Sequence, residues 1–106
     1  MTAPLYTHEP GGVIVVPGDI LSTNAQEIKS HIFASLSRMP ADSEWDCVEL
    51  DVSQASMIDS VGLNLLVMVI KSLHQRGKRL RLRTSNAHVL RTLRFARLDQ
   101  IAEVVS

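Results

Sequence analysis

The chain has 106 residues, which is enough for one domain with a modest hydrophobic core, and we expect that domain to span residues 1–106. Its formal net charge of zero argues against a general nucleic-acid binder. Its single cysteine, Cys47, excludes an internal disulfide and makes no metal site by itself. No apolar run reaches the about 18 residues of a membrane span, and the N-terminus lacks a signal-peptide pattern, so we expect a cytoplasmic protein.

Charge is distributed unevenly along the chain. Residues 1–60 carry nine acidic and two basic side chains, a net of −7, whereas residues 61–106 carry the opposite imbalance, +7. Such an asymmetry either steers a partner or draws the two halves of the domain together. We favour the second interpretation, because the halves are expected to share one sheet.

The first half of the chain predicts strands on either side of a helix. A short strand is expected near residues 5–7, and an apolar run that a Pro-Gly pair ends predicts another over 13–16. A helix is predicted over about 24–37, and a further strand over 46–52. Four apolar residues of this helix recur at helical spacing and are expected to face the core: Ala25, Ile28, Ile32 and Leu36.

The second half predicts a helix over about 60–76 that Gly77 ends as its C-cap. Residues 78–83 then alternate with period two, which indicates a strand whose leucines face the core. The alternate arginines of this strand face water, a partner or acidic side chains, since a strand covered on both faces would not tolerate them. We do not interpret them as a nucleic-acid patch, because no aromatic residues interleave with them.

A last helix is predicted over 86–96, followed by a strand over 101–105. The residues of this helix that face the core are expected to be Val89, Leu90, Leu93 and Phe95. The arginines of this segment then form a solvated basic face, which consists of Arg91, Arg94 and Arg97.

The central helix is apolar on nearly all sides. Asp59 and Ser60 stand where its N-cap belongs. At about 100° per residue, one face is expected to form the core and contains Leu63, Leu66, Val67, Ile70 and Leu73. The opposite side contains Val61, Leu65, Met68 and Ser72. That second stripe is either buried within the domain or a docking surface for another protein, and we favour docking.

Two stretches in the middle of the chain resemble the signature of STAS domains: Leu50-Asp51-Val52-Ser53 and Met57-Ile58-Asp59-Ser60-Val61-Gly62-Leu63. This family includes the anti-sigma factor antagonists and the cytoplasmic domains of sulphate transporters, and the flanking elements also come in its order. The resemblance implies an α/β fold: a single STAS domain with a mixed four- to five-stranded β-sheet packed with α-helices. Antagonists usually have Gly-Leu-Asp where this chain has Arg97-Leu98-Asp99, so Arg97 either takes a left-handed conformation or the cap is built differently.

The resemblance also implies a phosphorylation switch. In the antagonist branch, the serine after the aspartate is phosphorylated by an anti-sigma factor that is also a serine kinase, and this role falls on Ser60. The unmodified chain would bind that kinase, the phosphorylated chain would release it, and a serine phosphatase would reset the chain. We expect the partner to contact Asp59, Ser60, Val61, Asn64, Leu65 and Met68. The chain itself would be a monomer or weak dimer, with no nucleic-acid partner and no direct membrane insertion.

Two alternatives remain. The first is a STAS accessory subunit of a membrane transporter for lipids or anions, without a phosphorylation switch. The second is an enzyme, which the sequence supports poorly. A Gly-x-Ser-x-Gly elbow is incomplete because Ile58 stands where its first glycine belongs. The four histidines show no triad or metal spacing. We therefore expect no catalytic residue, metal or cofactor.

Overall fold

The structure is a computed structural model that describes residues 12–39 and 45–106. Its elements are β1 (Val13–Val15), α1 (Ala25–Ser37), β2 (Cys47–Asp51), α2 (Ser60–Gln75), β3 (Arg79–Arg83), α3 (Ala87–Phe95), the 3₁₀ turn η2 (Leu98–Gln100) and β4 (Glu103–Val105). The four strands pair in parallel in the order β1-β2-β3-β4, which confirms the α/β class. The sheet was expected to be mixed, and the four described strands are all parallel. The strand expected at residues 5–7 lies outside the described residues.

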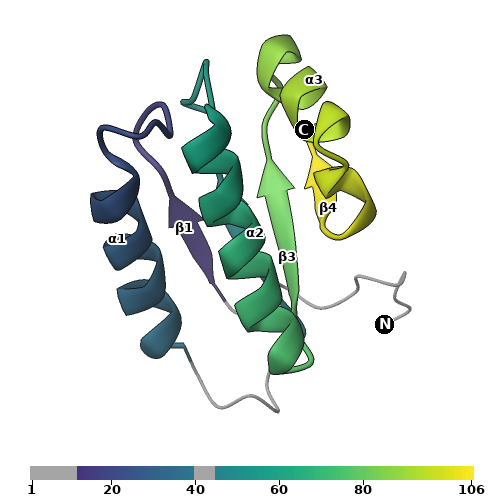
Figure 1. Ribbon diagram of the computed structural model, residues 1–106. Coiled ribbons are helices and arrows are strands. Elements are labelled where there is room, and N and C mark those ends of the chain that lie inside the picture. Colours follow the sequence, from purple (N-terminus) through teal and green to yellow (C-terminus); the bar gives the residue numbers. More distant parts are fainter. Residues whose placement is uncertain (1–11, 40–44) are drawn as a thin grey trace.

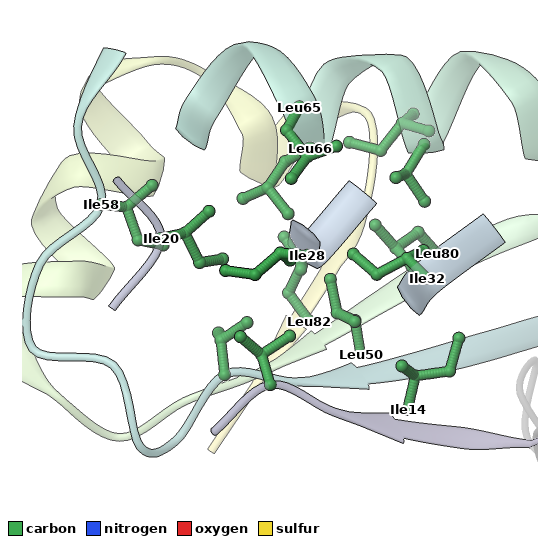
Figure 2. Packing of buried hydrophobic residues seen from close by; sticks show 14 of the residues in the cluster. Ile14, Ile20, Ile28, Ile32, Leu50, Ile58, Leu65, Leu66, Leu80 and Leu82 are labelled. Carbon is green, nitrogen blue, oxygen red and sulfur yellow. The ribbon is translucent and has the colours of Figure 1, made fainter. Parts of the chain in front are cut away.

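All three helices cover the same face of the sheet (Figure 1). This follows from the strand order, because right-handed crossovers between successive parallel neighbours bring each helix back to one side. Ile14, Leu50 and Leu82 lie in register across β1, β2 and β3 and point into the layer between sheet and helices. Figure 2 shows this cluster from close by, and burial of such side chains is the main stabilising term of the domain.

The opposite face of the sheet pairs charges between strands. Glu49 of β2 is only 6% exposed and accepts from Arg83 of β3, with an Nε–Oε2 distance of 2.7 Å. Arg81 lies 3.6 Å from the same carboxylate and 3.0 Å from Glu103 of β4. The β3 arginines thus meet acidic side chains, one of the predicted environments. Glu49 also joins the acidic half of the chain to the basic half.

Left-handed residues close the second and third helices. Gly77 has φ 72°, and the N–H of Lys78 donates to the carbonyl of Leu73 at 2.8 Å, so the predicted glycine C-cap forms. Arg97 has φ 62°, which confirms the first of its two expected conformations. The prediction for Phe95 was wrong: this last residue of α3 points to solvent, because Val89 and Leu93 already turn the helix toward the core.

Candidate functional site

The site is built where two loops meet at the carboxyl edge of the sheet. Ile20, before α1, pairs with Ile58, before α2, in an isolated parallel bridge. The N–H of Ile20 donates to the carbonyl of Met57 and the N–H of Asp59 to the carbonyl of Ile20, each at 3.2 Å. Figure 2 shows the two isoleucine side chains beside each other. The start of α2 is therefore anchored to the loop that follows β1.

Each of these loops contributes an aspartate to the other. Asp19 accepts from the N–H groups of Ser56, at 2.7 Å, and Met57, at 3.1 Å, and from the Ser56 hydroxyl. Asp59 in turn accepts from the N–H of Ser22 at 2.8 Å. The hydrogen bond from the Ser56 N–H is the largest cause that lowers the pKa of Asp19. These N–H donors favour the ionised form of both aspartates, so the loops are held together most strongly when both carboxylates are charged.

Asp59 also caps α2, as its position in the sequence predicts. Its Oδ1 accepts from the N–H of Gly62 at 2.9 Å, and this bond is the largest cause that lowers the Asp59 pKa. Ser60 follows as the first helical residue and is exposed. Within the described residues its hydroxyl has no hydrogen-bond partner. The structure thus presents Ser60 to solvent on a helix start that both loops hold in place.

Gly62 allows this close packing. A Cβ at this position would lie 2.4 Å from the carbonyl oxygen of Ile20 and 2.9 Å from Cγ2 of Ile58. Neither distance is possible without a shift, and the first contact is with backbone. The glycine of the Asp-Ser-x-Gly-Leu motif is therefore required by packing.

Most of the expected partner-binding residues lie at the surface. Ser60, Val61, Asn64 and Met68 are exposed, with Val61 at 45% and Met68 at 39%, and Asp59 is half-buried. We call Ser60, Val61, Asn64 and Met68 the α2 face. Leu65 does not belong to it, because it is only 3% exposed and lies among the core side chains (Figure 2). The prediction that Leu65 is a docking residue was wrong.

The error concerns the rotation of α2 about its axis. Its buried residues span an arc of roughly 140° at 100° per residue and are Gly62, Leu65, Leu66, Val69, Ile70 and Leu73. Such an arc is wide because α2 packs both on the sheet, at β3, and against α1 (Figure 1). The predicted arc was displaced by about 70°, so Leu63 and Val67 are half-buried at the edge of the true buried arc instead of at its centre.

Sequence reasoning missed Met57, Ser22 and the bonding role of Asp19. Met57 is 49% exposed and lies two residues before the cap of α2. Its signal was an apolar side chain in an otherwise polar turn. No comparable signal marks Asp19 and Ser22, because their partners lie 37 positions away in the chain.

The described residues contain no cluster of three or more His, Cys, Asp or Glu side chains that could hold a metal ion. Asp51 ends β2 and accepts from the N–H of Ser53 at 2.9 Å, which closes a local turn. None of the helices in this part of the chain is both long and apolar enough to cross a bilayer.

Comparison with known proteins agrees with this architecture. The family model of the STAS domain matches residues 3–106. An anti-sigma factor antagonist from Mycobacterium paratuberculosis is similar in structure, with a TM-score of 0.74 and 19% identity, over 92% of this chain and 80% of that one. The STAS domain of a SulP transporter from Vibrio cholerae has a TM-score of 0.69 and 17% identity, over 94% of this chain and 77% of that one. The anti-sigma factor antagonist SpoIIAA in its unphosphorylated form has a TM-score of 0.58 and 16% identity, over 83% of this chain and 77% of that one. The chain belongs to the STAS domain family.

Proposed function

We propose that this chain is an anti-sigma factor antagonist whose binding to a serine kinase of the anti-sigma class is switched by phosphorylation of Ser60. The observation that carries the proposal is the exposed Ser60 at the start of α2, on the same helix face as the apolar side chains of Val61 and Met68. STAS domains are binding and regulatory modules, and antagonists are among the similar structures. The ATP and its metal ion would belong to the kinase.

The unmodified α2 face suits a protein partner. Val61 and Met68 supply apolar area that the domain leaves uncovered, and Asn64 supplies hydrogen-bonding groups between them. Met57 extends the apolar area onto the preceding loop. Both oxygens of Asp59 already accept backbone N–H groups, so its contribution is to hold Ser60 in position and to add negative charge.

A phosphate on Ser60 would act mainly on the partner. It adds about −1.5 to −2 charges, and the positive end of α2 partly compensates them. Repulsion from Asp59 opposes this gain, so folding stability should change little. A partner pressed against Ser60 would have to desolvate the dianion, which should cost at least about 2 kcal/mol, or roughly thirtyfold in affinity. A serine phosphatase would restore binding.

Phosphorylation of the purified chain tests the proposal. The chain is incubated with an anti-sigma serine kinase from the same organism and ATP, and the product is mapped by peptide mass spectrometry. We expect one phosphate, on Ser60, and none on Ser60→Ala. Ser30→Ala, at an exposed serine of α1, is the matched control and should be phosphorylated like the wild type. A phosphate on another residue, or on none, contradicts the proposal.

An accessory subunit of a lipid or anion transporter is the second proposal, favoured by the shared fold with the SulP transporter domain. On that view the α2 face docks on the transporter and Ser60 is not modified. Transporter binding that is equal for Ser60→Ala, Ser60→Asp and the wild type would support it.

A further inference from the structure

A second exposed surface lies on α3. Phe95 is 91% exposed, more than any other large hydrophobic residue in the described part of the chain. Helical spacing places it on the side of α3 opposite Val89 and Leu93, which are buried. Arg91 and Arg94 share that outer side. An exposed aromatic ring therefore stands among cationic side chains.

The arginines around this ring are not neutralised by the domain itself. Arg91, Arg94 and Arg97 are exposed, and none of them has an ion-pair partner among residues 12–39 and 45–106. The arginines of β3 differ, since Arg83 meets Glu49. We call Arg91, Arg94, Phe95 and Arg97 the α3 basic surface. Asp99, in η2, is the acidic residue that follows it and reduces its net charge from +3 to +2.

This surface is separate from the α2 face. In a parallel sheet with crossover helices, each helix runs antiparallel to the strands. Ser60 begins α2 and so lies at the carboxyl edge of the sheet, whereas Phe95 ends α3, a separate helix that follows β3. In Figure 1, α3 lies beyond the carboxyl end of β3, apart from α2. The two surfaces therefore belong to different helices and share no residue.

We propose that the α3 basic surface binds anionic lipid headgroups at a membrane surface. An anionic bilayer accepts guanidinium groups in its headgroup layer and an aromatic ring just below it, without requiring a matching shape. Protein interfaces also use aromatic and arginine side chains, but they surround a larger apolar core, which a single ring does not provide. A symmetric contact with a second copy would bring arginines against arginines.

The charge distribution of the whole chain orients this contact. Residues 61–106 carry +7 and residues 1–60 carry −7, so the molecule approaches an anionic plane with its basic part. Each arginine near such a surface strengthens binding about fivefold, so a net charge of +2 gives roughly 25-fold. The contact is thus weak, reversible and sensitive to salt. It does not depend on phosphorylation of Ser60.

Vesicle sedimentation of the full chain tests the proposal. One set of vesicles is phosphatidylcholine alone, and the other contains about one-third phosphatidylserine. We expect the chain to bind the anionic vesicles at least roughly tenfold more tightly than the neutral ones, and raised salt to abolish the difference. Phe95→Ala should weaken anionic binding severalfold, and the double variant Arg91→Glu, Arg94→Glu should abolish it.

The matched control is the double variant Arg38→Glu, Lys71→Glu. It makes the same change in net charge at two exposed positions, the C-cap of α1 and a residue of α2, and should keep most of the binding. Thermal melts confirm that each variant is folded. Equal binding to both vesicle types, or an equal loss in both double variants, overturns the proposal. A loss of binding to the anti-sigma kinase in Phe95→Ala would also overturn it and assign the surface to a protein partner.

Discussion

Replacing Gly62 with alanine tests how tightly α2 packs on the loop before α1. The added Cβ would meet the carbonyl oxygen of Ile20 at 2.4 Å, so α2 must move by about an ångström to reach an ordinary contact distance. That movement weakens the hydrogen bond from the Asp59 N–H to the same oxygen, worth about 1 kcal/mol, and adds overpacking of about 1–3 kcal/mol. Alanine recovers about 1 kcal/mol of helix propensity. We expect a net loss of about 1–3 kcal/mol.

Urea denaturation measures this loss, because the fluorescence of the buried Trp45 reports on the folded state. Asn64→Ala is the matched control: it places alanine on the exposed face of the same helix and should stabilise by up to about 0.7 kcal/mol. If Gly62→Ala unfolds at the same urea concentration as Asn64→Ala, the steric reasoning is refuted. Gly62 would then have no packing role at the start of α2.

Three further predictions concern stability. Leu65→Lys should destabilise the domain by at least about 3 kcal/mol, because it buries a charge. Met68→Lys should change the thermal melt little and weaken partner binding. Similar melting temperatures for the two variants would contradict the assigned rotation of α2. Arg97→Gly should stabilise the domain by about 0.5–1 kcal/mol in urea denaturation, since it removes the strain of a left-handed non-glycine residue. A loss of stability would mean that contacts of the arginine side chain outweigh this strain. The lowered pKa values of Asp19 and Asp59 stabilise the fold fully above the ordinary value of about 4, and this stabilisation is lost progressively as the pH falls from there through the lowered pKa values. Asp19→Asn should therefore flatten the acid limb of a pH titration of unfolding.

Local signals in the sequence were sufficient for the helix ends. Asp59 caps α2, Gly77 closes it, and Arg97 takes the left-handed conformation, because each of these depends on a few neighbouring residues. The alternation of arginine and leucine in β3 likewise predicted which side chains face the core. The proposed phosphoacceptor, Ser60, lies beside one of these local signals, which explains why its exposure followed from the sequence.

Contacts between distant segments were beyond this reasoning. Because α2 is apolar on nearly all sides, its sequence pattern does not fix which arc faces the sheet, and Leu65 was assigned to the wrong side. The bonds of Asp19 to Ser56 and of Asp59 to Ser22 join residues 37 positions apart. Phe95 was assigned to the core by its residue type, although helical spacing from Val89 and Leu93 places it on the opposite side of α3, where it is exposed.

The central claim is that a phosphate on Ser60 breaks partner binding without disturbing the fold. Isothermal titration of the anti-sigma kinase, with ADP present, compares the unmodified chain, the chain phosphorylated on Ser60 and Ser60→Ala. The account predicts that the phosphorylated chain binds at least about thirtyfold more weakly, that Ser60→Ala binds like the unmodified chain, and that all three have similar thermal melts. Equal affinity of the phosphorylated and unmodified chains, with both folded, would contradict it.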